Sequence, residues 1–347
     1  MKKKSTLKLL TLFLIVSCLL VSSMYSFISA KEDDDTKIFY FSADNKQEFV
    51  ISNEPAKDWD PTLASDDELK HYGIPERPAD KESLKQWESM VKGKMYIKPS
   101  FTPIKSSSHK VKFNTYANTQ NWSGYVKKCK TGYTLKSVLG TWTVKTASAT
   151  LGNRPADSAP WVGLGGYAPL NSALAQAGTV SNVTSGGTSE YYTWFEVIGT
   201  NLDESAYKLD NMATSPNDSI TINVFVSYVS STDLTNINYY IVNNTTNTYT
   251  SFSKVASGNY TGQNQLGSSA EWILERPELN LTNFGSVLFS NCKYSYLASA
   301  EYYLADDNSS PSTVESITMK NSLSTTLAYP TSLSSNGTFT VYWSTYK

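Results

Sequence analysis

The sequence predicts an all-β protein, an antiparallel two-sheet β-sandwich of the jelly-roll kind, preceded by a small and partly helical leader segment. From about residue 113 onward, short runs rich in Thr, Val, Tyr, Ser and Trp, such as SEYYTWFEVIG and DSITINVFVSYV, are separated by Gly and Asn. Apolar and polar residues alternate within these runs, which is typical of antiparallel strands joined by turns. Composition agrees, because 40% of the 347 residues are hydrophobic and only 18% are charged, which allows a sizeable core.

Residues 1–30 have the layout of a secretory signal peptide, with the basic tip MKKK, a long apolar run and small residues at Ser29 and Ala30. The apolar run approaches the roughly 20 residues that a membrane span requires, so a retained anchor is the alternative. We expect that residues 1–30 are removed, that the protein is secreted and extracellular, and that it has no membrane contact once the signal is gone.

Residues 31–112 differ from the rest of the chain and indicate a propeptide-like leader with a linker. They hold charged stretches such as KEDDD and DDELK, and Leu84, Trp87 and Val91 recur with helical spacing. The later stretch IKPSFTPIKSSSHK has the proline, serine and lysine content of a linker. We expect the leader to inhibit the protein and to be lost by cleavage, leaving residues 113–347 as the β-sandwich domain.

Histidine and cysteine limit the chemistry that the predicted sandwich can perform. The only histidines, His71 and His109, precede it, which excludes a Ser-His-Asp triad, a Cys-His pair and a His-ligated zinc site from a separate sandwich domain. We therefore expect no metal and no cofactor, and the net charge of −1 gives no sign of nucleic-acid binding. Outside the signal segment, Cys129 and Cys292 could form one disulfide in an oxidising compartment or remain two free thiols.

The stretch GSSAEWILERPELN carries two glutamates in an otherwise apolar run. In a strand, Glu271 and Glu275 point to one face while Trp272 and Leu274 point to the other. Pro277 is tolerated mainly at a strand end, so Glu275 should lie near a strand terminus, where a cleft can open. A charged group taken out of water costs several kcal/mol unless it is paired or used, which marks these glutamates as candidates for function.

A second run, YYTWFE, places Tyr192, Trp194 and Glu196 on one face of a strand. Aromatic side chains beside carboxylates on a curved sheet are compatible with three functions. One is hydrolysis in a wet groove, and another is a glycan-active jelly-roll enzyme, whose two carboxyl groups would lie roughly 5 to 10 Å apart. The third is a noncatalytic carbohydrate-binding or adhesion domain, in which the glutamates are incidental.

Six short motifs, in order, carry a resemblance to a known family. They are NWSGYV, WVGLGG, AQAG, YYTWFE, AEWILERP and NFGSVLFSN, between residues 121 and 291. In order and approximate spacing they resemble the glutamic peptidases of the eqolisin type. The resemblance implies a sandwich of two antiparallel sheets, no metal or cofactor, and endopeptidase activity at acid pH on protein or peptide substrates. We expect a monomer.

The resemblance also implies a site. The catalytic glutamine maps onto Gln176 and the catalytic glutamate onto Glu275, with Glu271 in reserve. Such a carboxylate can take a proton from water, and the glutamine amide can donate a hydrogen bond to the developing oxyanion. Four further residues match cleft positions that shape substrate subsites or orient the dyad: Trp122, Trp161, Trp194 and Glu196.

The sequence departs from the fungal members at two positions. Gly165 and Val180 stand where those members carry aspartates. Fewer neighbouring carboxylates mean less like-charge coupling on the dyad, which argues against a strongly acidic optimum. The region after about Ser295 does not align with the family motifs.

Overall fold

The chain consists of two contact units, residues 1–37 and 38–347, and this description concerns the second. A computed structural model describes residues 36–41, 47–104, 118–129, 131–148, 155–167, 173–199, 202, 205–277, 280–297, 303–304 and 312–345. The predicted signal segment and the predicted boundary at residue 112 lie outside these residues. Within them, no helix is both long enough and apolar enough to cross a membrane.

The strands form two sheets, and every pairing among the strands of the first, sheet B, is antiparallel. Sheet B has eight strands. In spatial order they are β17 (Ser312–Ile317), β5 (Trp122–Cys129), β14 (Ser269–Glu275), β7 (Ala156–Gly165), β8 (Leu174–Val183), β9 (Ser189–Ile198), β10 (Ala206–Leu209) and β4 (Phe101–Pro103).

The second sheet, sheet A, has twelve strands. Its main path is β1 (Lys37–Phe41), β2 (Gln47–Ile51), β13 (Thr248–Ser257), β12 (Leu234–Asn243), β11 (Ser219–Val229), β6 (Leu135–Thr143), β15 (Ser286–Tyr296), β20 (Phe339–Trp343), β19 (Thr326–Pro330) and β18 (Met319–Lys320). Off this path, β16 (Tyr303–Leu304) pairs with β15, and β3 (Met95–Tyr96) pairs with β13 in parallel.

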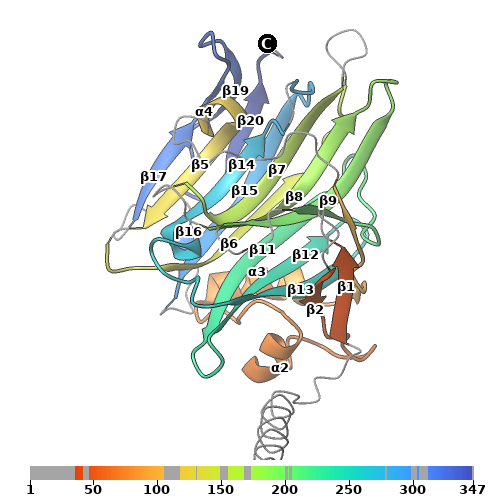
Figure 1. The fold of residues 1–347 in the computed structure, drawn as a ribbon, viewed down its shortest axis with the longest axis vertical. Coiled ribbons are helices and arrows are strands. Elements are labelled where there is room, and N and C mark those ends of the chain that lie inside the picture. The colour runs from red at the N-terminus through yellow and green to blue at the C-terminus, as the bar shows by residue number, and fades with distance from the viewer. Residues whose placement is uncertain are drawn as a thin grey trace, which may run out of the picture. The chain divides into compact units, whose positions relative to one another are not determined.

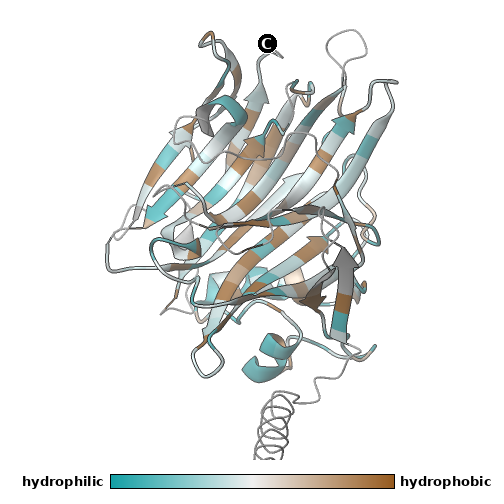
Figure 2. Ribbon diagram, viewed as in Figure 1, coloured by the Kyte–Doolittle hydropathy of each residue, from teal (hydrophilic) through white to brown (hydrophobic). Residues whose placement is uncertain are grey.

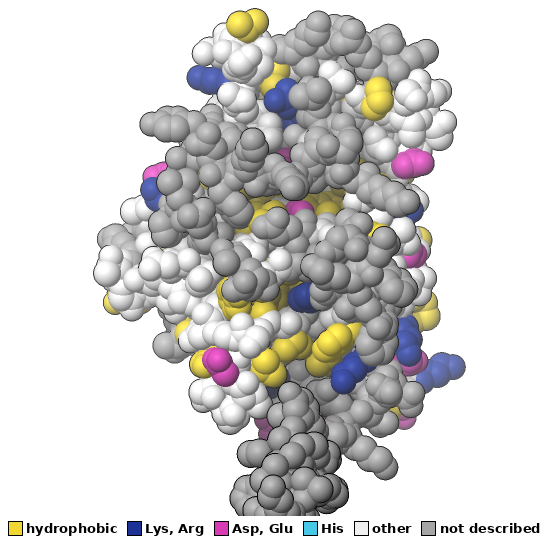
Figure 3. All heavy atoms as spheres, viewed as in Figure 1, with side chains coloured by type: hydrophobic (Ala, Val, Ile, Leu, Met, Phe, Trp, Pro, Cys, Tyr) yellow, Lys and Arg dark blue, Asp and Glu magenta, His cyan; other side chains and the backbone are white. Residues whose placement is uncertain are grey.

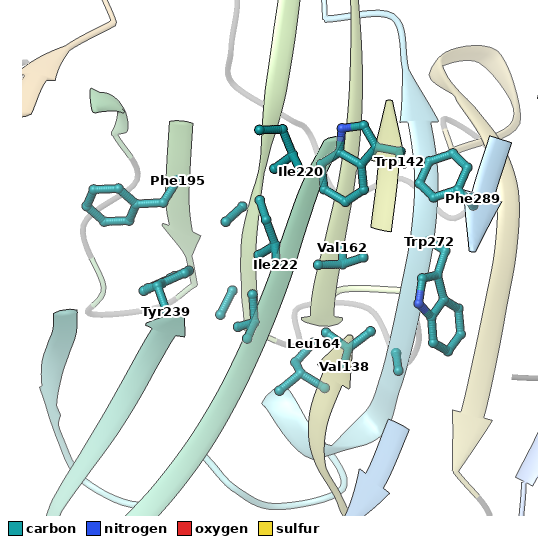
Figure 4. Packing of buried hydrophobic residues seen from close by; sticks show 14 of the residues in the cluster. Val138, Trp142, Val162, Leu164, Phe195, Ile220, Ile222, Tyr239, Trp272 and Phe289 are labelled. Carbon is teal, nitrogen blue, oxygen red and sulfur yellow. The ribbon is translucent and has the colours of Figure 1, made fainter. Parts of the chain in front are cut away.

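The main hydrophobic core lies between the two sheets (Figure 4). Trp272 and Phe195 come from sheet B, and Trp142 and Phe289 come from sheet A. The indole of Trp272 donates to the backbone oxygen of Leu139 at 2.7 Å, so even this buried N–H is satisfied. Apolar and polar residues alternate along many strands, as the sequence predicts (Figure 2). The predicted fold class, an antiparallel two-sheet sandwich, is confirmed.

The described part of the leader is partly helical, as predicted, and it packs against sheet A, which the sequence did not indicate (Figure 1). Its helices are α2 (Asp66–His71) and α3 (Lys81–Val91); beyond it lie the short helices α4 (Asn118–Asn121) and η2 (Leu266–Ser268). Asp80 caps α3 by accepting from the backbone N–H of Ser83 at 2.7 Å. The apolar face of α3, with Trp87 and Val91, then packs against Tyr240 of sheet A in a cluster of its own.

Candidate active site

The register of sheet B brings three of the candidate polar side chains into one row. Glu271 of β14 pairs with Gly163 of β7, Gly163 pairs with Gln176 of β8, and Gln176 pairs with Glu196 of β9. Directly paired residues point to the same face of a sheet. Glu271, Gln176 and Glu196 therefore lie on the face opposite to Trp272, which is the outer face of sheet B.

Glu275 lies on this same outer face, at the last residue of β14. It pairs with Trp122 of β5 on one side and with Ala159 of β7 on the other. The strand ends there, two residues before Pro277, in agreement with the sequence prediction. On this face Trp122, Trp161, Val180, Trp194 and other apolar side chains form a second cluster, separate from the main core.

Two glycines make room for the indole of Trp161 beside the glutamates. A Cβ atom at Gly163 would lie 2.9 Å from ring atom Cζ3 of Trp161, and one at Gly178 would lie 2.6 Å from the Trp161 Cβ. Real Cβ atoms do not approach that closely, so a side chain at Gly163 would displace the indole, and one at Gly178 would displace the base of the Trp161 side chain and the backbone oxygen of Pro160. The two glycines therefore let Trp161 lie across the strands with its Nε1 directed at Glu275.

The carboxyl group of Glu275 is held by tryptophan indoles. Trp161 Nε1 donates to Glu275 Oε2 at 2.8 Å, and Trp122 donates a second hydrogen bond. The two indole rings pack edge to face, 5.0 Å apart between centroids. Burial raises the pKa of Glu275 to about 7, and the hydrogen bonds from Trp161 and Trp122 oppose that rise.

Glu196 orients the amide group of Gln176. Gln176 Nε2 donates to Glu196 Oε2 at 2.7 Å, and both side chains are only 2% exposed. Because a carboxylate only accepts hydrogen bonds, this contact fixes which end of the amide faces Glu196. Among the described residues, Gln176 Oε1 has no hydrogen-bond partner. One N–H of the amide and its oxygen thus have no partner among the described residues. Gln176 itself does not line the small cavity nearby, and it adjoins that cavity through Glu196.

A small cavity of about 40 Å³ opens beside these groups. Its walls include both Glu275 and Glu196, with Asp157, Trp194 and other residues around them: Ile104, Val180, Tyr192, Ala206 and Pro277. In the space-filling view, hydrophobic side chains gather around an acidic one near the middle of the visible face (Figure 3). Two larger cavities, of about 480 and 240 Å³, lie between the leader and sheet A, and neither contains a candidate glutamate.

Glu271 differs from Glu275 in its access to this cavity. It is 0% exposed and is not among the residues that line the cavity. Burial raises the pKa of Glu271 well above its usual value, and neither of its carboxyl oxygens has a hydrogen-bond partner among the described residues. A carboxyl group in this position has no open space in which to meet a water or a substrate.

The cysteines require a correction of the disulfide that the sequence permits. Both Cys129 and Cys292 are free thiols in the structure. Cys129 lies on β5 of sheet B and Cys292 on β15 of sheet A, where its Sγ contacts the backbone oxygen of Ser290 at 3.9 Å. Burial raises the pKa of Cys129 to about 12 and that of Cys292 well above its usual value, so neither is a reactive thiolate.

Three cavity residues, Ile104, Asp157 and Ala206, were not identified from the sequence. Asp157 lies on β7 with the same alternation as Trp161, so the period-two pattern of that strand would have placed it on the site face. Ile104 belongs to the leader, and no pattern in the sequence connects it with the glutamates. Among the described residues, no three His, Cys, Asp or Glu side chains gather closely enough to hold a metal ion.

Comparison with known proteins gives a family match and three similar structures. The model of the Peptidase A4 family matches residues 120–343, and no curated protein matches the chain. Scytalido-glutamic peptidase with a transition-state analogue inhibitor has a TM-score of 0.49 at 21% identity, over 65% of this chain and 98% of that one. The same peptidase with a peptide-based analogue gives 0.47 at 21% identity, with the same coverage. SCP-B, a member of the eqolisin family in complex with the tripeptide Ala-Ile-His, gives 0.45 at 20% identity, again over 65% and 98% of the two chains.

Proposed function

Since its residues 120–343 match the family model, the chain belongs to the peptidase A4 family, the eqolisin-type glutamic peptidases, and we propose that it cleaves peptide bonds with Glu275 and Gln176 as its catalytic pair. The enzyme class, a glutamic-type endopeptidase, follows from the family. The observation that supports the pair is one cavity with Glu275 in its wall, and with Glu196, the partner of Gln176, in the same wall.

Glu275 acts in this proposal as a general base on water. Its ionised carboxylate takes a proton from a water molecule, whose oxygen attacks the carbonyl carbon of the scissile peptide bond. When the tetrahedral intermediate collapses, the protonated Glu275 gives that proton to the leaving amine, so the carboxylate is regenerated. The indoles of Trp161 and Trp122 fix the direction of the carboxyl group throughout.

Gln176 stabilises the charge that develops on the carbonyl oxygen. The amide NH₂ has two hydrogens, and Glu196 Oε2 accepts only one of them. The other can donate to the oxyanion, an interaction that is stronger in the transition state than with the neutral carbonyl. The free Oε1 of Gln176 can accept from the attacking water. Glu196 would then be a positioning residue for the amide.

The pKa of Glu275 bears on the working pH. A general base must be ionised, and a pKa of about 7 leaves most of Glu275 protonated at pH 4. Cleavage at acid pH, as the resemblance implies, remains a prediction. The geometry and burial of Glu275 support instead a range from weakly acidic to neutral pH, in line with Gly165 and Val180 at positions where fungal members carry aspartates.

The test of this function is proteolysis of a denatured protein. The full chain and the protein cut between residues 104 and 118 are both assayed on unfolded casein at a series of pH values. At least one of the two forms should digest it, and EDTA should leave the rate unchanged if no metal takes part. An absence of any cleavage between pH 3 and 9 by both folded forms would contradict the proposal. Secretion by a cleaved signal peptide is proposed separately, and N-terminal sequencing of the exported protein tests it.

A further inference from the structure

The last residues of the leader are built into sheet B beside the proposed site. Strand β4 pairs antiparallel with β10, with Phe101 opposite Leu209 and Pro103 opposite Tyr207. The ladder continues as the backbone N–H of Ile104 donates to the oxygen of Ala206 at 2.9 Å. Side chains reinforce it, because Thr102 Oγ1 donates to Asp210 Oδ2 at 2.9 Å and Ser100 Oγ donates to Asn211 Oδ1 at 2.8 Å.

Phe101 anchors this strand in the core between the sheets. Its ring contacts Phe195 of sheet B with 5.2 Å between centroids and Phe252 of sheet A with 5.0 Å. The strand could leave only if this aromatic contact separated and Phe101 entered water, which is unfavourable for so large an apolar side chain.

The rest of the leader is attached to sheet A by buried contacts. Trp87 and Val91 are 3% and 1% exposed beneath α3, and the hydroxyl of Tyr240 donates to the Met90 oxygen at 3.3 Å. Strand β3 adds backbone bonds, from Met95 N–H to the Asn247 oxygen at 2.8 Å and from Ile97 N–H to the Tyr249 oxygen at 2.7 Å. Residues 47–104 therefore contact both sheets through hydrophobic packing and strand pairing together.

From these contacts we infer that residues 47–104 stay bound to the peptidase after any cut between residues 104 and 118, and that Ile104 is a specificity-determining wall of its substrate pocket. Ile104 lines the cavity that contains Glu275 and Glu196, and it packs on the cluster that includes Trp194. This inference rests on the proposed function, because it assigns the cavity to a substrate side chain.

The size of the cavity and the residues in its walls predict which substrate side chain it accepts. Its remaining walls are mostly apolar, with Val180, Tyr192 and Ala206 around Ile104. At about 40 Å³ the cavity is much smaller than the cavities of about 480 and 240 Å³ beside sheet A, which favours a short side chain. We expect the intact enzyme to favour a small apolar residue, such as alanine, at the position that enters this pocket. Carboxylates at Asp157, Glu196 and Glu275 disfavour an acidic residue there.

The first experiment compares cleavage profiles of opposed variants. The intact protein, Ile104→Ala and Ile104→Phe are incubated with a mixed peptide library, and products are sequenced by mass spectrometry. Ile104→Ala enlarges the pocket and should shift the preference at one position from alanine toward leucine or phenylalanine by about tenfold or more. Ile104→Phe fills it and should narrow the preference to glycine and alanine. Thr102→Ala, on the same strand but exposed and hydrogen-bonded away from the cavity, is the matched control and should keep the wild-type profile.

The second experiment tests retention without relying on activity. A site for a sequence-specific protease is inserted between residues 105 and 117, the folded protein is cut, and both fragments are followed by size-exclusion chromatography without denaturant. We expect the two fragments to elute together and to separate only in denaturant. A leader fragment that elutes alone, beside a core with an unchanged cleavage profile, would overturn the inference.

The two experiments distinguish an error in the role assigned to Ile104 from an error in the proposed peptidase activity. Cleavage with the same profile for wild type, Ile104→Ala and Thr102→Ala would keep the peptidase and remove Ile104 from its pocket. Absence of cleavage by the wild-type protein, both intact and cut between residues 105 and 117, would overturn both the proposed function and this specificity role.

Discussion

Two positions on strand β14 carry the same residue in two different situations. Glu271 and Glu275 lie on one face of one strand, and burial raises the pKa of both. Glu275 receives indole hydrogen bonds and lines a cavity, whereas Glu271 is 0% exposed and lies away from that cavity. The comparison teaches that burial alone does not identify a catalytic carboxyl group. Access to open space, together with donors that favour the ionised form, distinguishes one glutamate from the other.

The largest expected effect comes from removing the base. Glu275→Gln keeps the shape of the side chain but cannot take a proton, and should lower kcat by about 10² to 10⁴. Glu271→Gln is the matched control and should lower kcat by less than about tenfold, because its carboxyl group has no access to the cavity. Initial rates on casein measure both, with circular dichroism to show that each variant is folded. If Glu271→Gln were the inactive variant instead, the roles of the two glutamates would be exchanged.

The next effect concerns the partner of the base. Gln176→Ala removes the oxyanion donor and should lower kcat by about 10² to 10³. Both groups act on one transition state, so the double variant with Glu275→Gln should be little slower than the slower single variant. A double variant whose losses simply multiply would mean that Gln176 and Glu275 act independently. Near-normal turnover by a folded Gln176→Ala protein would remove Gln176 from the mechanism.

The third effect is on stability. The pKa of Glu275 in the fold, about 7, lies above its ordinary value of 4.5, so the folded chain binds the proton more tightly than the unfolded chain. Its contribution to stability is therefore complete below about pH 4.5 and is lost as the pH rises toward 7. Glu275→Gln lacks this loss, and its stability relative to wild type should increase by about 3 kcal/mol between pH 4 and pH 7.5. Glu271→Gln should change in the same direction.

Urea unfolding at both pH values measures this difference. The control is Glu315→Gln, because the pKa of Glu315 is lowered by its contact with Lys128, which gives the opposite sign. A relative stability of Glu275→Gln that does not depend on pH would show that Glu275 ionises normally in the fold.

The smallest expected effect is the change in kcat/KM for each unit of pH. If Glu275 is the base, kcat/KM should fall by about tenfold for each pH unit below about 7. A pH series on a small peptide substrate checks this, with a substrate concentration far below KM so that the profile reports the free enzyme. A profile that peaks near pH 4 would mean that Glu275 is ionised at acid pH, and would favour the acid optimum that the resemblance implies.

The sequence was most informative where a strict local period applies. Alternation along one strand correctly separated Glu271 and Glu275 from Trp272, and Pro277 located the strand end. It could not show that Glu196 holds Gln176, because that contact depends on the register between β8 and β9. The register between two strands depends on how both pack along their whole length, so it cannot be predicted from the sequence of one strand.

The sequence also could not show which strands far apart in the chain pair with each other. The leader was expected to be separate from the sandwich, yet Ile104 reaches the site cavity because β4 pairs with β10, about a hundred residues later in the chain. Of the two alternatives for Cys129 and Cys292, the structure has two free thiols, and a sequence does not contain the spacing of two backbones on which a disulfide depends.

The pairing of the leader with β10 and β13 also bears on association between copies of the chain. Strands β4, β2 and β3 cover backbone N–H and C=O groups along β10 and β13, which would otherwise be open to another chain. Exposed strand edges are templates for intermolecular pairing and hence for aggregation. A peptidase domain produced without residues 47–104 would present both edges to solvent at once, and would be prone to join its own copies strand to strand before it met a substrate.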